Sequence, residues 1–250
     1  MDKMIFTSLS GHKHVDQRVQ QLANEISNVS TTGFKQQLAA ATEAYRYEGD
    51  GHPSRIVPVV TATRRVDLRD GPMQSTGRPL DIAVSGNQLF GVLTEAGDTA
   101  YTRRGDLVIG GDGTLRIGSG EQISSDAGGP ITVPALTEVK IGPDGTVFGK
   151  QVGGEAVVFQ PLARIKVVDA DPTKVVIRTD GLFESVDRTP FDAATTPAVQ
   201  SGALEGSNVS LFSAMVDMIG MSRRYEMQVK VMKQASDLAE RSQSLARLTQ

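Results

Sequence analysis

The stretch VDQRVQQLANEISNV, residues 15–29, carries apolar residues at seven-residue spacing, and this spacing determines the structure predicted for the start of the chain. Two interleaved ladders run through it and back towards residue 1. Their members are Ile5, His12, Val19 and Ile26 in one, and Met1, Ser8, Val15, Leu22 and Val29 in the other. A seven-residue apolar repeat makes a narrow seam that needs a second helix against it. We therefore predict a helix over about residues 4–29, about 40 Å long at 1.5 Å per residue.

The other end of the chain repeats this pattern. Its ladder contains Leu211, Met218, Tyr225, Met232, Ala239 and Ala246, joined by Met215 and Val229. Because Ser207-Asn208 is a good helix start, we predict a helix from about residue 209 onward. The two seams predict that the helices pair with each other or with other copies. The predicted assembly seam consists of Val15, Val19, Leu22, Ile26, Val29, Leu211, Met215, Met218, Tyr225, Val229 and Met232.

Between the ends, short β-rich runs alternate with turns. Residues 107–109 and 114–117 flank Gly-Gly-Asp-Gly, and residues 139–141 and 146–148 flank Gly-Pro-Asp-Gly, so each set predicts a hairpin. Further strands are expected at 162–168 and 175–178. The fold class predicted is α+β: terminal helices paired as a coiled-coil-like domain, with an inserted all-β barrel or sandwich. The predicted segments are an N-terminal helix (1–33), an extended connector (34–80), a β domain (81–195), and the C-terminal helix with its lead-in (196–250).

Composition excludes several classes of protein. The 250 residues carry a net charge of −3, which does not favour nucleic acid as a partner, and no apolar run is long enough to cross a bilayer. The first residues lack the apolar core of a signal peptide. Cysteine is absent, which excludes disulfides and thiolate chemistry and fits the cytosol as well as export of an unfolded chain.

Chemical motifs are weak throughout. His12 and His14 point to different sides of a helix, so a shared metal is not expected. The sequence contains no HExxH, GxSxG or P-loop pattern, and Asp169-Ala170-Asp171-Pro172 lacks the glycine and distal glutamate of a calcium loop. We therefore expect no catalytic, cofactor-binding or metal-binding residues and no cofactor.

Two sequence blocks are more specific than these weak motifs. They are NEISNVSTTGFK at residues 24–35 and GALEGSNV at residues 202–209, the latter followed by RRYE at 223–226. With GRPLDIAV at 77–84 and AYTRRG at 100–105, they resemble the terminal and central signatures of the bacterial flagellar rod and hook family. Glu25 and Ser27 depart from the family pattern. The signature residues are Asn24, Asn28, Thr31, Gly33, Phe34, Leu204, Glu205, Ser207, Asn208, Val209, Arg223 and Glu226.

The resemblance is strongest to the proximal-rod branch. It implies a non-enzymatic structural subunit of the basal-body rod, exported by the flagellar type III apparatus without a cleaved signal and located in the periplasmic part of the rod. The implied partners are copies of itself, other rod proteins and the export apparatus, with no nucleic acid and no membrane insertion. The alternatives are a distal-rod or hook-type member, a phage-tail or surface-filament protein, and a β-domain enzyme.

Overall fold

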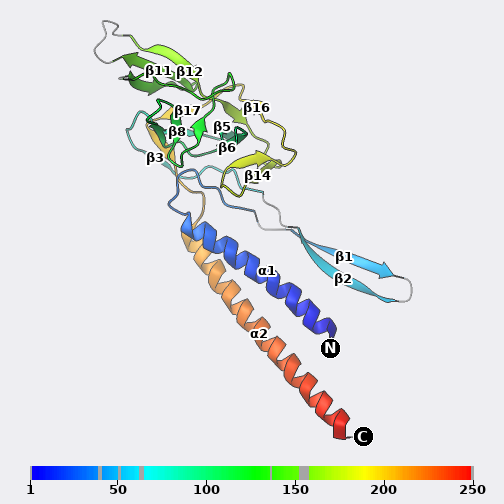
Figure 1. The fold of residues 1–250 in the computed structure, drawn as a ribbon. Coiled ribbons are helices and arrows are strands. Elements are labelled where there is room, and N and C mark those ends of the chain that lie inside the picture. Colours follow the sequence, from blue (N-terminus) through cyan, green and yellow to red (C-terminus); the bar gives the residue numbers. More distant parts are fainter. Residues whose placement is uncertain are drawn as a thin grey trace. The chain divides into compact units, whose positions relative to one another are not determined.

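A computed structural model describes residues 2–38, 41–49, 52–61, 65–135, 137–151 and 158–248 (Figure 1). The chain divides into two compact units, each built from segments distant in sequence. The helical unit comprises Met1–Ser27, Ala39–Thr63 and Ser210–Gln250. The β-rich unit comprises Asn28–Leu38 and Arg64–Val209.

Two long helices make up most of the helical unit. Helix α1 spans Asp2–Ser27 and helix α2 spans Leu211–Leu248, so the sequence prediction located both to within about two residues. They pack side by side and run in opposite directions (Figure 1). Neither of these described helices is apolar over a length that could cross a membrane.

The helical unit also contains a hairpin that the sequence analysis did not predict. Strand β1, Ala41–Gly49, pairs antiparallel with β2, His52–Thr61. Pro58 lies opposite Ala44 in this two-stranded sheet. A proline is tolerated because both strands are edges, where a missing N–H need not break a second ladder. The residues expected to form an extended connector thus include a paired hairpin.

The β-rich unit holds a nine-stranded sheet and three smaller sheets. Seven strands of the large sheet follow the order β14-β15-β6-β5-β9-β8-β7, with β13 joining β5 to β16. The bounds in this sheet are β5 Gln88–Leu93, β6 Thr99–Thr102, β7 Leu107–Ile109, β8 Leu115–Ile117, β9 Gln122–Ile123, β13 Val167–Asp169, β14 Val175–Ile177, β15 Phe183–Ser185 and β16 Asp192–Ala193. In the smaller sheets they are β3 Met73–Ser75, β4 Ile82–Val84, β10 Thr137–Ile141, β11 Thr146–Gln151, β12 Gln160–Arg164, β17 Val199–Ser201 and β18 Ala203–Glu205.

Both predicted hairpins are confirmed. Strand β7 pairs with β8, with Leu107 opposite Ile117, and β10 pairs with β11, with Ile141 opposite Val147. The turn glycines Gly113 and Gly145 have φ of 75° and 81°, a conformation that glycine adopts without a steric cost. The local pairing therefore follows from turn chemistry that is visible in the sequence.

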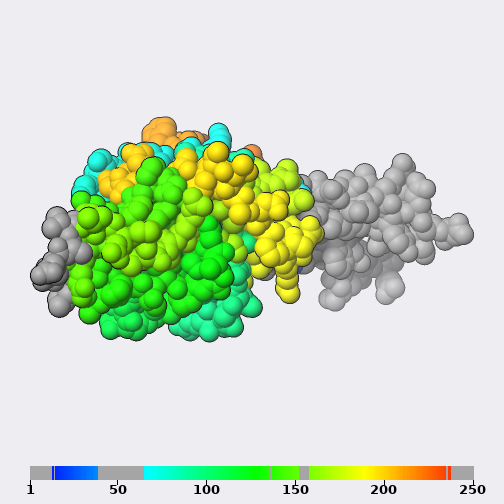
Figure 2. All heavy atoms as spheres, turned by 90° about the horizontal axis from the view of Figure 1, so that it is seen from above, coloured from blue at the N-terminus to red at the C-terminus, as the bar shows by residue number. Residues whose placement is uncertain are grey.

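The last strands before α2 pair with strands near the start of the β-rich unit. Strand β17 pairs with β4, and β18 pairs with β3. On the face in Figure 2, the yellow residues near the end of this unit lie directly against the green middle of the chain. The main core lies among these sheets and includes the fully buried Ile82, Phe90, Leu107, Ile117 and Val147. Long-range pairing thus closes the β-rich unit.

The predicted fold class is wrong. The described residues contain eighteen strands against two helices, so the protein is mostly β-sheet rather than an α+β fold with a coiled-coil-like domain. A coiled coil needs the apolar ladders of both helices in one seam. On α2, the ladder residues Leu211, Met215, Tyr225 and Val229 are 40–50% exposed, so the two ladders do not close on each other.

Candidate assembly site

Within residues 15–26, helix α1 carries one covered stripe of apolar residues. The side chains of Val15 and Leu22 are 5% and 0% exposed, and Val19 and Ile26 are half-buried. Their spacing of three and four residues places them on one side of the helix. The structure thus brings the front part of the predicted seam together. Val29 lies beyond the end of α1 in the following turn, where it is half-buried.

A charged residue interrupts this stripe. Glu25 is 1% exposed although it is ionisable. Gln21 donates a hydrogen bond from Nε2 to Glu25 Oε1 at 3.0 Å, and Arg18 NH1 lies 3.8 Å from the same oxygen. Because these residues stand four and seven positions earlier, they share its side of the helix. The front seam is therefore partly polar, which the ladder alone did not indicate.

On α2 the covered stripe is displaced from the predicted one. Ala214 is 3% exposed, and the half-buried residues that follow it are Met218, Met221, Gln228 and Met232. Met218 and Met232 belong to the predicted seam and lie in this stripe. Leu211, Met215, Tyr225 and Val229 belong to the predicted seam but are 40%, 50%, 44% and 41% exposed.

A second set of apolar side chains on α2 faces water. The exposed fractions are 79% for Phe212, 53% for Val216, 56% for Ile219, 58% for Met227 and 48% for Val231. Steps of three, four and eight residues keep these side chains on one side of the helix. We call these five residues the open face of α2. A row of exposed apolar residues of this length is typical of a surface that another protein covers.

In the β-rich unit, three charged residues distant in sequence meet in the interior. Lys35 Nζ lies 2.6 Å from Glu205 Oε1, and Arg103 NH1 lies 3.0 Å from Glu205 Oε2. All three side chains are 0% exposed. They come from the block at residues 24–35, the central AYTRRG segment and the block at residues 202–209. The three segments that carry the family resemblance therefore converge on one buried ion cluster.

The cluster is completed by a fourth charge and by main-chain oxygens. Arg103 NH2 lies 3.2 Å from Asp70 Oδ1, whose side chain is 45% exposed. Lys35 Nζ donates to the carbonyl of Arg69 at 2.7 Å, and Arg103 donates to those of Val84, at 2.6 Å, and Gly86. Two cations thus face two carboxylates, and buried charges are tolerated when they are paired and hydrogen-bonded in this way.

Main-chain contacts tie the same segments together. Gly33, with φ of 68°, donates its N–H to the Glu205 carbonyl at 2.7 Å. A Cβ at Gly33 would lie 2.6 Å from the Arg103 carbonyl carbon, so only glycine fits there. Asn208 accepts from Gln36 N–H at 2.8 Å and donates to the Asp67 carbonyl at 2.8 Å. The chain that follows α1 and the chain that leads into α2 are therefore held in one small region of the β-rich unit.

The other signature residues are distributed as follows. Ser207 and Val209 are buried, and Asn28, Thr31, Phe34 and Leu204 are half-buried, all in the β-rich unit. Asn24 on α1 and Arg223 and Glu226 on α2 are exposed members of the helical unit. Nine of the signature residues thus lie in the β-rich unit, and three lie on helix surfaces.

Known flagellar rod proteins resemble this chain over nearly its whole length. The chain is 36% identical to the flagellar basal-body rod protein FlgF of Escherichia coli K12, over 98% of both chains. It is 34% identical to FlgF of Salmonella typhimurium LT2, again over 98% of both. The chain belongs to the flagellar basal-body rod protein family. It is a structural subunit of the basal-body rod. Its sequence identity to these two FlgF proteins is higher than its 28% identity to the rod protein FlgG of Bacillus subtilis 168.

Two domain families of rod and hook proteins also match. Residues 83–149 match the D1 domain of the flagellar hook proteins FlgE/F/G, and residues 200–245 match the C-terminal region of the FlgEFG rod proteins. The first match covers much of the nine-stranded sheet and β10–β11, and the second begins just before Glu205 and includes the open face of α2. Members of this family assemble with other rod and hook proteins and are structural rather than known as enzymes.

Lys35, Arg103 and Asp70 were not among the residues singled out from the sequence. Lys35 and Arg103 lie inside the quoted blocks, but nothing local distinguishes a buried cation from an exposed one. Their partner Glu205 is 170 positions from Lys35. Burial lowers the pKa of the Lys35 ammonium, and the hydrogen bond to Glu205 acts against this shift. Lys35 therefore depends on Glu205 to remain charged in the interior. Across the described residues, no group of three metal-ligating side chains converges.

Proposed function

We propose that this rod-family chain is a proximal-rod subunit that assembles through the open face of α2 and the covered stripes of its two helices. The observation that carries the proposal is the water-facing row from Phe212 to Val231, with exposed fractions of 48–79%. Removing apolar surface from water stabilises an interface by about 25 cal/mol per Å². In a helical array the open face of every subunit would be covered by a neighbouring subunit. The free energy gained by burying this apolar surface would therefore recur at each subunit along the rod.

The proposed partners are copies of the same chain and other proximal and distal rod proteins. Torque passes along such a rod through rigid packing, and the buried ion cluster would hold the two chain segments that adjoin the helices. We also propose export by the flagellar type III apparatus without a cleaved signal, and a location in the periplasmic part of the basal body. The absence of cysteine is compatible with this route, since an unfolded exported chain without thiols cannot become crosslinked through disulfides.

The test replaces one residue of the open face and compares it with a matched neighbour. Ile219→Asp places a carboxylate on the proposed interface, while Ser222→Asp places one at an exposed polar position one turn later. Both proteins should fold as soluble chains, because both sites face water. In cells lacking the native gene, Ile219→Asp should abolish complete basal bodies and motility, and Ser222→Asp should retain them. Electron microscopy of purified basal bodies and swimming assays measure this; normal rods containing the Ile219→Asp subunit would contradict the proposal.

A further inference from the structure

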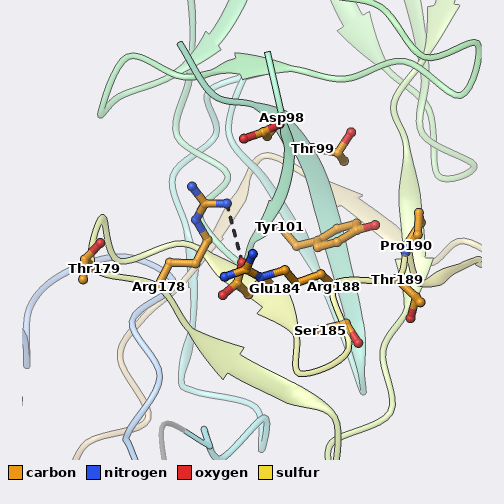
Figure 3. A pocket seen from close by; sticks show the side chains of 10 residues that line it. All are labelled: Asp98, Thr99, Tyr101, Arg178, Thr179, Glu184, Ser185, Arg188, Thr189 and Pro190. Carbon is orange, nitrogen blue, oxygen red and sulfur yellow. Dashed lines mark ion pairs between the residues drawn. The ribbon is translucent and has the colours of Figure 1, made fainter. Parts of the chain in front are cut away.

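A polar hollow of about 660 Å³ lies on the β-rich unit (Figure 3). Strand β6 contributes Thr99 and Tyr101 to its wall and rim, the residue before this strand is Asp98, and the β14–β15 hairpin contributes Arg178 and Glu184. The segment that follows β15 brings in Arg188. In Figure 3 the side chains of Arg178, Glu184 and Arg188 approach one another beneath Asp98 and Thr99. The rod-family comparisons assign no role to this hollow.

The backbone of Arg188 is the first sign that this residue has a specific role. Its φ is +56°, a left-handed conformation that side chains other than glycine adopt at a steric cost. Ten other described residues have positive φ, and all ten are glycines. A glycine would therefore relieve the backbone at position 188. Arg188 also donates its N–H to the Ser185 carbonyl at 2.9 Å, and its side chain is exposed.

The guanidinium of Arg188 is available for a ligand, whereas that of Arg178 is occupied. Arg178 Nε lies 3.1 Å from Asp180 Oδ2, and its NH1 lies 3.6 Å from Glu184 Oε2. Within the part of the chain that the structure describes, Arg188 forms neither an ion pair nor a side-chain hydrogen bond. Arg178 is shared between Asp180 and Glu184, so Arg188 is the unpaired cation among the described residues that line the hollow, with a planar fork of donors that suits a carboxylate.

Hydroxyl groups also line the hollow, and in Figure 3 that of Tyr101 points toward Pro190 rather than toward the Arg188 guanidinium. Tyr101 Oη accepts a hydrogen bond from Phe191 N–H at 3.2 Å, which leaves its own proton to donate. Burial raises the pKa of Tyr101, so the phenol remains a neutral donor at pH 7. Its ring is fixed against Phe191, with centroids 5.0 Å apart. The Ser185 hydroxyl beneath the hollow is buried and has no hydrogen-bond partner among the described groups.

The charges of the hollow restrict what it can bind. Asp98 and Glu184 also line it, so a multiply charged anion such as phosphate would meet two carboxylates. A single carboxylate on a carrier with N–H groups would instead pair with Arg188 and donate to Asp98. We propose that this hollow binds an acidic peptide segment through a glutamate or aspartate carboxylate held by Arg188. That the segment comes from another rod subunit rests on the proposed function; the binding itself does not.

The experiment titrates the isotope-labelled full chain with acetyl-Gly-Glu-Gly-amide and follows its amide resonances. Saturable shifts confined to residues 98–101 and 178–190 are expected. The neutral acetyl-Gly-Gln-Gly-amide, acetate and inorganic phosphate should each bind at least tenfold more weakly. An absence of saturable shifts, or equal binding of the glutamine peptide, would overturn the proposal. Equal binding by acetate would show a site for free carboxylates and would also overturn the peptide assignment.

Variants separate a binding role of Arg188 from a structural one. Arg188→Gly removes the guanidinium and relieves the backbone, so peptide binding should fall at least tenfold while the thermal midpoint stays level or rises. Lys174→Gln removes one exposed charge outside the hollow and should leave binding unchanged. A large loss of thermal stability in Arg188→Gly, or unchanged binding, would overturn the inference. Because no step requires rod assembly, a negative result here leaves the proposed function standing, and failed assembly of Ile219→Asp leaves this test unaffected.

Discussion

Lys35 Nζ and Glu205 Oε1 lie 2.6 Å apart in the interior of the β-rich unit, although 170 positions separate them in sequence. Lys35 follows the first helix by eight residues, and Glu205 precedes the second by six. The carboxylate of Glu205 also accepts the N–H of Gly71 at 2.8 Å. One buried side chain thus joins the beginning, the middle and the end of this unit.

Removing the charge of Glu205 should therefore be severe. In Glu205→Gln, Lys35 and Arg103 stay buried and face the half-exposed Asp70 as their remaining carboxylate. Breaking a buried ion pair from one side costs about 3–5 kcal/mol of unfolding free energy. Urea unfolding followed by amide resonances of β5 and β6 measures the loss. Glu184→Gln, which breaks a partly exposed pair, is the control and should cost at most about 1 kcal/mol.

The same pair can be tested with a double-mutant cycle. Lys35→Met leaves Glu205 with Arg103, and the double variant Lys35→Met/Glu205→Gln removes one charge of each sign from the interior. We expect the double variant to be more stable than the sum of the single changes predicts, by at least about 1.5 kcal/mol, because neither partner is left alone. Strict additivity of the three unfolding free energies would show that the two side chains do not interact.

Close packing at Gly105 gives an independent prediction about the AYTRRG segment. A Cβ there would lie 1.7 Å from the main-chain oxygen of Ile82, and Ile82 donates its own N–H to the Gly105 carbonyl at 2.9 Å. Gly105→Ala must move backbone and should destabilise the β-rich unit by about 1–3 kcal/mol. Gly111→Ala has open space around its Cβ and should change stability by less than about 0.5 kcal/mol in the same urea experiment.

What the sequence could predict depended on the range of the interactions. Hairpins such as Leu107–Ile117 follow from adjacent residues and turn glycines, and the extents of α1 and α2 follow from periodicity. The coiled-coil prediction failed because a ladder shows which residues are apolar but not which side of a helix its neighbour covers. On α2 the covered side holds Ala214 and Met221, while Met215 remains half exposed.

The ion cluster was beyond prediction for a different reason. No sequence pattern near Lys35, Arg103 or Glu205 indicates burial, and charged residues are usually exposed. Their pairing is set by strands that close over long sequence separations, such as β18 on β3. The resemblance to rod proteins marked Glu205 as a signature residue but gave no physical role for it. The structure supplies that role as the counter-charge of two buried cations.

Acid should destabilise the β-rich unit through its hairpin turns. Hydrogen bonds from Thr146 lower the pKa of Asp144, and those from Thr114 and Arg116 lower the pKa of Asp112. A carboxyl whose folded pKa is depressed stabilises the protein above its ordinary value of 3.8 and loses that contribution as pH falls through the folded pKa. We therefore expect the urea midpoint to fall progressively below about pH 4.

Replacing the turn aspartates tests this assignment. Asp144→Asn and Asp112→Asn keep one oxygen that can accept the main-chain N–H of Thr146 or Thr114, lose the second acceptor and cannot titrate, so each should flatten the decline of the urea midpoint between pH 5 and pH 2. Asp187→Asn is the control, because Asp187 is exposed and makes no side-chain hydrogen bond within the described residues. An unchanged slope in both turn variants would contradict the assignment.

The covered stripe of α1 gives the last prediction. Leu22 is 0% exposed and Val19 is half-buried, so Leu22→Asp or Val19→Asp places a carboxylate in an apolar contact at a cost of several kcal/mol. Assembly and motility should be lost, while amide resonances of β5 and β6 in the β-rich unit stay native. Ala23→Asp is the matched control, since residue 23 is exposed and adjoins Leu22. Arg18→Asp is unsuitable, because it would place a second carboxylate beside the buried Glu25. Complete, rotating basal bodies that contain the Leu22→Asp subunit would show that this stripe is not needed for the rod.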